Sequence, residues 1–237
     1  MSLFKKKETK PVCSAVILAA GNSVRMGADK TVMQLGGMSV IERAVLAFER
    51  SEYVDEIILV TKGEKVQELA EQFHEGHEKV KLVVTGGETR TESALAGVSN
   101  VKKDAKLIAI HDGARPFVSQ KLIADAVCAA EKYYAAMPGI PVNDTLKLTD
   151  DHKTSGTLDR SKVVRVQTPQ VFKSEVIKGA LTYAMQHDLT LTDDSSAVEC
   201  MGIQTYITEG DERNIKLTTP FDVEIGEIII KYNGDEL

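Results

Sequence analysis

One stretch near the start of the chain constrains the fold more than any other. Residues 13–18 are apolar and rich in β-branched side chains, which is typical of a strand buried on both faces of a parallel sheet. The strand leads into a loop of small residues, 19–21, where backbone N–H groups can approach a ligand closely, and Arg25 and Lys30 follow. Such a strand and loop predict a polyphosphate site at the carboxyl edge of an open α/β sheet.

The residues of this loop leave a second interpretation open, an ordinary strand-to-helix turn with incidental charges. The loop is not a Walker A sequence, because it has no Gly-Lys-Ser/Thr, and the further glycines of the dinucleotide fingerprint do not follow Gly21. Neither of these two phosphate-loop motifs therefore decides between the interpretations.

Strands and helices alternate along most of the chain, which predicts an α/β fold with a doubly wound, mostly parallel sheet. The patterns indicate strands at about 56–60, 81–84 and 107–110, and helices at about 40–48, 66–73, 88–98, 119–134, 174–185, 196–201 and 220–230. Because loops at the carboxyl ends of parallel strands meet at one edge, the loops with Gly21, Gly87 and Gly113 should converge. We expect a single domain over residues 12–237.

The pattern changes between about 142 and 166, where two weakly alternating polar segments flank the turn at residues 150–153. This predicts a β-hairpin arm that projects from the sheet. An isolated polar hairpin with few core residues is poorly stabilised, so we expect the arm to pack against a second copy of the chain. A flexible surface hairpin is the alternative.

Composition narrows the class of protein. A formal net charge of -6 argues against a general nucleic-acid-binding surface, and no apolar run is long enough to span a bilayer. Residues 1–11 read as a disordered or extended lead-in without the apolar core of a signal peptide. The widely spaced Cys13, Cys128 and Cys200 are expected to be buried free thiols in a reducing cytoplasm. We therefore expect a cytoplasmic protein with neither membrane nor nucleic-acid partners.

Several polar side chains follow expected strands, and among them cations outnumber carboxylates although the whole chain is acidic. They are Arg25, Lys30, Asp112, Arg115, Thr145, Arg160, Thr168 and Lys216. This local excess of positive charge suits a substrate with several phosphates, because phosphoryl transfer depends on positioning and charge neutralisation. Asp112 has the carboxylate that a hard cation such as Mg²⁺ prefers, although a turn aspartate is an equally ordinary interpretation. His111 beside it is expected to be a hydrogen-bonded histidine near the core.

Seven motifs in order carry a resemblance that covers about residues 12–230. They are Leu-Ala-Ala-Gly…Arg-Met-Gly at 18–27, Gly-Gly-Glu-Thr-Arg…Ser at 86–93, His-Asp-Gly-Ala-Arg-Pro at 111–116, Pro-Val-Asn-Asp-Thr at 141–145, Thr-Pro-Gln at 168–170, Thr-Asp-Asp at 192–194 and Asn-Ile-Lys at 214–216. The first motif is shared with many sugar-phosphate nucleotidyltransferases, and the others are more specific. The sequence resembles the 2-C-methyl-D-erythritol 4-phosphate cytidylyltransferases of the non-mevalonate isoprenoid pathway.

The resemblance implies a Rossmann-like fold, a homodimer joined by an exchanged arm, and the use of CTP and Mg²⁺. By position, the nucleotide site comprises Ala19, Ala20, Gly21, Gly87, Glu88, Ser93 and Asp112, and Asp112 is also the residue near the metal. Arg25 and Lys216 resemble cations of the family that act on the phosphates, and our hypothesis adds Lys30 to this catalytic set. The polyol-phosphate site comprises Thr145, Arg160, Thr168 and Arg115. The implied reaction is direct in-line attack of the acceptor phosphate on the α-phosphate of CTP, which releases pyrophosphate and forms the CDP-polyol.

The chain departs from the family pattern after Gly27. Val32 and Met33 stand where a phosphate-binding lysine and a glutamine are expected, and Ser23 replaces the second glycine of the loop. Our hypothesis is that Lys30 supplies the missing positive charge. Two alternative functions stay open at this point: a cytidylyltransferase for another polyol phosphate, such as ribitol 5-phosphate, or a nucleotide-binding homologue whose catalysis is impaired by Val32.

Overall fold

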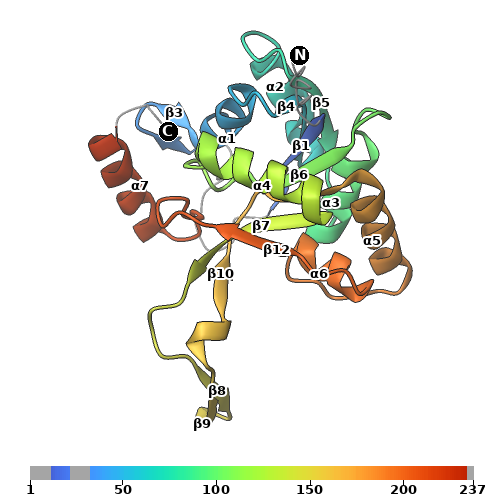
Figure 1. Ribbon diagram of the computed structural model, residues 1–237. Helices are drawn as coiled ribbons and strands as arrows, with labels where there is room; N and C mark the ends of the chain where they lie inside the picture. The colour runs from blue at the N-terminus through green and yellow to red at the C-terminus, as the bar shows by residue number, and fades with distance from the viewer. Residues whose placement is uncertain (1–11, 22–32, 234–237) are drawn as a thin grey trace, which may run out of the picture.

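The computed structural model describes residues 12–21 and 33–233, and a parallel sheet forms its centre (Figure 1). The first strand, β1 (Cys13–Leu18), pairs in parallel with both β4 (Val54–Thr61) and β6 (Leu107–Asp112). On the outer side of β4, β5 (Val80–Thr85) adds a fourth parallel strand. The doubly wound α/β fold expected from the sequence is therefore confirmed.

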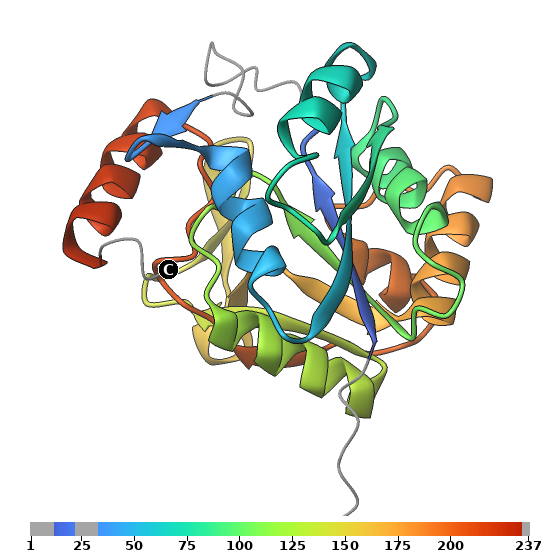
Figure 2. The ribbon, with the colours of Figure 1, turned by 90° about the horizontal axis from the view of Figure 1, so that it is seen from above.

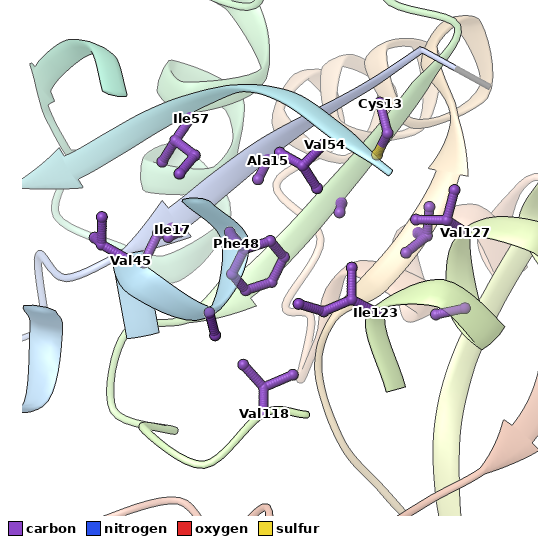
Figure 3. Close-up of a cluster of buried hydrophobic side chains, with 14 of the residues drawn as sticks. Cys13, Ala15, Ile17, Val45, Phe48, Val54, Ile57, Val118, Ile123 and Val127 are labelled. Carbon is purple, nitrogen blue, oxygen red and sulfur yellow. The ribbon is translucent and has the colours of Figure 1, made fainter. Parts of the chain in front are cut away.

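Residues of β1 alternate between two cores, which explains why the strand is an unbroken apolar run. Ala15 and Ile17 belong to the core on one face, and Val16 belongs to the core on the other. The first core lies under α1 (Val40–Glu49), α2 (Val66–Gln72) and α4 (Gln120–Tyr133). Figure 3 shows Phe48 of α1 in this core, near Ile17 and Ile123.

Helices α3 (Arg90–Ser99), α5 (Ser174–Gln186) and α6 (Asp194–Cys200) cover the other face. Figure 2 shows α3 and α5 on the opposite side of the sheet from α1 and α4. A short 3₁₀ helix, η1 (Gly63–Lys65), links β4 to α2. Both faces of β1, β4 and β6 are thus closed, and the open part of this sheet is the edge where the strands end.

The second half of the sheet is mixed, and the sequence patterns did not predict its strands. β11 (Gln170–Lys173) runs antiparallel to β6 and to β7 (Ala135–Pro141), and β10 (Val164–Val166) is antiparallel to β7. The remaining strand, β12 (Tyr206–Glu209), is parallel to β7. β7 contains proline and glycine, which are unfavourable in strands, and β10, β11 and β12 have only 3, 4 and 4 residues, too few for a recognisable alternation. Pairing with neighbouring strands therefore defines these segments as strands.

The expected hairpin arm is present and projects from the body of the molecule (Figure 1). Its strands β8 (Lys147–Asp150) and β9 (Lys153–Thr157) are antiparallel, and the 3₁₀ helix η2 (Arg160–Lys162) follows. Asp151 and His152 both have positive φ, 42° and 60°, which is the geometry of a tight two-residue hairpin turn. Its strand residues are exposed apart from the half-buried Gly156, so little apolar burial holds the arm in place.

A small satellite packs beside the main domain. The hairpin of β2 (Gln34–Leu35) and β3 (Met38–Ser39) lies against α7 (Pro220–Asn233). Leu35, Phe117 and Leu217 form its buried centre, and Met33 packs partly buried against them.

The expectation of three buried thiols is wrong for two of them. Cys13 is buried and burial raises its pKa to about 12, whereas Cys128 and Cys200 are free and exposed. Cys128 lies on α4, whose buried side is formed by other residues such as Ile123 and Val127. Among the described residues, no helix combines the length and apolarity that crossing a membrane requires.

Candidate active site

A cleft of about 670 Å³ opens at the carboxyl edge of the parallel strands. Its wall combines the end of β1, the loops after β4 and β5, the start of α3, the loop after β6, and a segment before α7. The residues are Leu18, Ala19, Ala20, Gly21, Ile41, Lys62, Gly63, Glu64, Thr85, Gly86, Gly87, Glu88, Thr89, Arg90, Ser93, Asp112, Gly113, Ala114, Lys216 and Thr218. The predicted convergence of the three glycine loops is thus confirmed.

Two glycines in the wall of this cleft allow neighbouring loops to approach closely. A Cβ atom at Gly86 would lie 2.6 Å from Cβ of Ala20 and 2.7 Å from Oγ of Ser93. At Gly113 it would lie 3.0 Å from the Leu18 carbonyl oxygen, and the Gly113 N–H donates to that oxygen at 2.8 Å. Glycine at both positions lets neighbouring loops pack closely, because any side chain would push them apart.

The loop from Gly86 to Thr89 is fixed by the first turn of α3. The Gly87 N–H donates to Oγ of Ser93 at 3.1 Å, and the Glu88 N–H donates to Oε2 of Glu92 at 2.6 Å. Thr89 and Glu92 form a reciprocal capping box at the start of the helix. Gly87, Glu88 and Ser93, which were predicted in the nucleotide site, therefore form one rigid corner of the cleft.

Asp112, the last residue of β6, is surrounded by cations. Its Oδ2 lies 2.8 Å from Nζ of Lys216 and 3.8 Å from Nε of Arg115, and its Oδ1 lies 3.3 Å from Nη2 of Arg90. Burial alone would raise the pKa of Asp112, but the positive charges of Lys216 and Arg90 outweigh it and hold that pKa well below its usual range. The carboxylate is therefore ionised whenever the protein is folded at neutral pH.

Arg90 also pairs with a second carboxylate, Asp194 at the start of α6. Its Nη2 lies 2.7 Å from Oδ2 of Asp194, whose side chain is only 1% exposed. The pKa of Asp194 is raised by burial, in contrast to that of Asp112, although Arg90 opposes the shift. The two carboxylates differ because Asp194 is buried more deeply and has only one of the three cations that surround Asp112.

Behind Asp112 lies a chain of hydrogen bonds through Thr168 and His111. The Asp112 N–H donates to Oγ1 of Thr168 at 3.1 Å, and Oγ1 lies 3.0 Å from Nδ1 of His111. Nε2 of His111 must donate to the Arg115 carbonyl oxygen at 3.1 Å, so Nδ1 accepts and the Thr168 hydroxyl donates. Burial lowers the pKa of His111 to about 4, which keeps the ring neutral. The expectation of a hydrogen-bonded core histidine is confirmed.

Two residues predicted to contact the acceptor, Thr168 and Arg115, lie behind the cleft wall rather than in it. Thr168 is buried, and Arg115 directs Nη1 to the Asn214 carbonyl oxygen at 2.8 Å. In this structure both organise the residues around Asp112.

The arm residues Thr145 and Arg160 do not line the cleft of their own chain. Both are exposed, and Arg160 donates from Nη1 to the Asn143 carbonyl oxygen at the base of the arm. Arg25, Lys30, Ser23 and Val32 lie outside the described residues, so the hypothesis that Lys30 replaces a missing cation stays a prediction.

Sequence reasoning missed several residues that line the cleft, above all Arg90, with Lys62, Glu64, Thr85, Thr89 and Thr218. Arg90 is the first residue of α3 and follows the two glycines of the β5 loop. A cation at the start of a helix opposes the helix dipole, which is the signal that could have singled it out.

Comparison with known proteins identifies the family to which this chain belongs. The family model described as IspD, 2-C-methyl-D-erythritol 4-phosphate cytidylyltransferase, matches residues 13–232. The chain belongs to this family. Cytidylyltransferases are nucleotidyltransferases, so the chain is an enzyme of that class.

Individual relatives of the cytidylyltransferase family agree with the match. A 2-C-methyl-D-erythritol 4-phosphate cytidylyltransferase of Caldanaerobacter subterraneus subsp. tengcongensis is 41% identical over 223 residues, which is 92% of this chain and 98% of the relative. The enzyme of Clostridium novyi is 36% identical over 224 residues, 92% of this chain and 96% of its own. These names do not favour ribitol 5-phosphate as acceptor or a homologue with impaired catalysis.

Solved structures of the family share the fold. The 4-diphosphocytidyl-2C-methyl-D-erythritol synthase of Anaerococcus prevotii superposes with a TM-score of 0.85 at 28% identity, over 94% of this chain and 97% of that one. The 2-C-methyl-D-erythritol 4-phosphate cytidylyltransferase of Thermus thermophilus gives a TM-score of 0.74 at 28% identity, over 91% and 98%.

The donor set fits a magnesium ion that is shared with a nucleotide. Among residues 12–21 and 33–233, no group of three or more His, Cys, Asp or Glu side chains could hold a metal alone. Mg²⁺ bound with nucleotides needs only one or two carboxylates, because phosphate oxygens and water complete its octahedron. Asp112 supplies one ionised carboxylate on the cleft wall, which is compatible with that arrangement.

Proposed function

We propose that the cleft transfers the cytidylyl group of CTP to 2-C-methyl-D-erythritol 4-phosphate and releases pyrophosphate. The family match over residues 13–232 supports this substrate pair. The observation that carries the assignment of residues is the position of Asp112, which is ionised, surrounded by cations and part of the cleft wall at the carboxyl edge of the sheet.

The nucleotide occupies the side of the cleft formed by residues 19–21 and 86–93. The first turn of α3 holds the Ser93 hydroxyl and the Gly87 loop in fixed positions, and polar groups in fixed positions are what recognition of a small polar base requires. Ala19, Ala20 and Gly21 expose backbone at the end of β1, where the phosphates can approach without contact with long side chains.

The reaction requires little acid–base catalysis by the protein. The nucleophile is an oxygen of a phosphate monoester, which is largely ionised at neutral pH because its second pKa is about 6. It attacks the α-phosphorus in line, pyrophosphate leaves from the opposite side, and no covalent enzyme intermediate forms. This agrees with a neutral, buried His111 that faces Thr168 and Arg115 rather than the cleft.

The contribution of the protein is positioning and charge neutralisation. Lys216 lines the cleft beside Asp112 and is suited to stabilise charge on the phosphates, together with Arg25 and Lys30. Asp112 would hold Mg²⁺, which when bound neutralises phosphate charge and orients the nucleotide.

The enzyme acts as a homodimer in which the arm of one copy reaches the cleft of the other. Thr145 and Arg160 are exposed on the arm and do not line their own cleft, so they are available to a second copy. Leu148, Leu158 and Val164 of the same region are 50%, 39% and 39% exposed. Apolar side chains left open on a narrow arm favour burial against a partner. The free thiols suit a cytoplasmic location.

Pyrophosphate release tests this function directly. The purified protein is incubated with CTP, Mg²⁺ and 2-C-methyl-D-erythritol 4-phosphate, beside matched reactions with ribitol 5-phosphate, with UTP or with EDTA. We expect release with the first combination and at least tenfold less in the others, because the base and acceptor contacts are polar and specific. Equal release with ribitol 5-phosphate would overturn the assigned acceptor, and release in EDTA would overturn the role of Mg²⁺.

A further inference from the structure

Asp194 is a buried carboxylate that is not needed to cap α6. Asp193 caps this helix, because its Oδ1 accepts the Ser196 N–H at 2.9 Å, and its Oδ2 accepts Nε2 of Gln170 at 2.7 Å. Asp194 instead directs Oδ2 to Arg90 at 2.7 Å, and its Oδ1 is buried without a hydrogen-bond partner. Leaving a buried carboxylate oxygen unpaired costs stability, so a helix start alone does not account for this residue.

The partner of Asp194 reaches the cleft. Nη2 of Arg90 is shared between Oδ2 of Asp194 and Oδ1 of Asp112, and Arg90 lines the cleft beside Asp112. The contact to Asp194 is the shorter, 2.7 Å against 3.3 Å. The side chain of Asp194 is only 1% exposed, so water cannot solvate its charge in place of Arg90. Asp194 therefore holds the guanidinium in position even when the charge around Asp112 changes.

The other cations around Asp112 are not equivalent. Arg115 is anchored to the Asn214 carbonyl oxygen at 2.8 Å and its side chain is 12% exposed. Lys216 is 40% exposed and, in the described part of the chain, its ammonium pairs only with Asp112. A divalent cation that approaches Oδ2 of Asp112 must displace a positive charge, and Lys216 is the one that can leave without breaking a second contact.

We propose that Asp194 is a positioning residue: it anchors Arg90 on Oδ1 of Asp112, so that Oδ2 exchanges between Lys216 and the divalent cation that enters with CTP. This proposal rests on the proposed cytidylyl transfer and on the metal role of Asp112. Without Asp194, Arg90 is free to pair with both oxygens of Asp112, and its positive charge beside Asp112 is no longer neutralised by a second carboxylate. Both effects oppose binding of the divalent cation to Asp112. Lys216, once displaced, remains on the cleft wall within reach of the phosphates.

The test compares D194N with D193N, two isosteric changes that each remove one carboxylate from the start of α6. Binding of Mn²⁺ in the presence of CTP, without acceptor, is followed by electron paramagnetic resonance. Binding of CTP in EDTA and the melting temperature are measured beside it. We expect D194N to weaken Mn²⁺ binding about tenfold, in the range known for residues that orient a metal ligand. D193N should keep Mn²⁺ binding although it destabilises the start of α6.

Two outcomes separate positioning from a structural role. The proposal requires that D194N keeps CTP binding in EDTA, and that the added change R90Q restores Mn²⁺ binding because the competing cation is gone. Parallel loss of Mn²⁺ binding, CTP binding and melting temperature in D194N, or no recovery on adding R90Q, would overturn it. If D194N does not fold, the double variant D194N/R90Q is compared with R90Q, and the two must bind Mn²⁺ equally because Asp194 acts only through Arg90. Weaker binding by the double variant would overturn the proposal.

The wild-type protein separates failure of this proposal from failure of the function. If wild type with CTP binds no Mn²⁺ and releases no pyrophosphate, the metal role of Asp112 is wrong. If wild type does both and D194N behaves like D193N, the assigned function stands and the positioning role of Asp194 is wrong.

Discussion

The cleft and the arm carry the predicted site residues in opposite physical settings. Around Asp112, charged groups are held by ion pairs and by a buried hydrogen-bond chain through Thr168 and His111. On the arm, Thr145 and Arg160 are exposed, and their hairpin has hardly any apolar core. The cleft is therefore preorganised within one chain, whereas the arm residues gain a defined position only when something packs against them.

The strongest test of the preorganised cleft is Asp112→Asn. Because the variant removes the negative charge that Lys216, Arg90 and the proposed cation share, we expect kcat/KM for pyrophosphate release to fall by about 10³-fold. Asp104→Asn, an exposed aspartate in a turn, is the matched control and should behave like wild type. A loss of less than tenfold in Asp112→Asn would show that the cleft does not depend on this charge.

The arm is tested by Arg160→Ala, with the exposed Lys162→Ala beside it as control. We expect loss of the proposed charge-assisted contact between Arg160 and the acceptor phosphate to raise the KM of the acceptor by about 10- to 100-fold. CTP binding should be unchanged, because residues 19–21 and 86–93, which hold the nucleotide in our proposal, include no arm residue. Equal effects of both variants would point to the net charge of the arm rather than to Arg160.

Mixing these two impaired chains, at an acceptor concentration well below the KM of Arg160→Ala, decides whether the arm acts across a dimer. A heterodimer of Arg160→Ala and Asp112→Asn chains has one site with an intact cleft and an intact arm only if the arm is exchanged. Equal mixing after unfolding and refolding should then restore about a quarter of the wild-type sites, since half of the dimers are mixed and each has one good site. No recovery would mean that each arm serves its own cleft or that no dimer forms.

A smaller effect is expected behind the cleft wall, in Thr168→Val. The change leaves the Asp112 N–H and Nδ1 of His111 without their shared partner, so we expect the unfolding free energy to fall by about 1–3 kcal/mol. kcat/KM should fall about tenfold as Asp112 loses its fixed orientation. Denaturant unfolding and steady-state kinetics measure both. Thr168→Ser keeps the hydroxyl, so its unfolding free energy and its kcat/KM should both be close to those of wild type. If they are as low as in Thr168→Val, the methyl group of Thr168 and not its hydroxyl is responsible.

The smallest effect on activity at neutral pH is expected from His111, which contributes instead to the pH dependence of stability. Its folded-state pKa is lowered to about 4 from an ordinary 6.5, so between these values the unfolded chain binds a proton that the folded chain does not. Stability contributed by His111 is therefore full above about pH 6.5 and is lost as pH falls towards 4, by at most about 1.4 kcal/mol per unit. His111→Gln should flatten this part of the curve, and the exposed His74→Gln is the control. Superimposable slopes in wild type and His111→Gln would contradict the prediction.

The sequence alone was informative where one local rule governs each residue. The buried strand at residues 13–18, the amphipathic helices and the hairpin arm all follow from periodicity and turn residues, and the structure confirms them. Convergence of Gly21, Gly87 and Gly113 also followed, because parallel strands place their carboxyl ends at one edge. The motifs at these loops were sufficient to place the chain in its family.

Only the tertiary structure decided which of these residues act together. Nothing in the spacing of Arg90, Asp112 and Asp194 shows that one guanidinium lies between two carboxylates, because the three come from different elements brought together by packing. The same holds for Thr168, predicted to contact the acceptor and found in a buried bond to His111. For a related reason the sequence did not predict strands β7, β10, β11 and β12. Their hydrogen bonds are to partners distant in the chain, so no local sequence pattern indicates them. Local sequence determines which elements form, and long-range packing determines which charges meet.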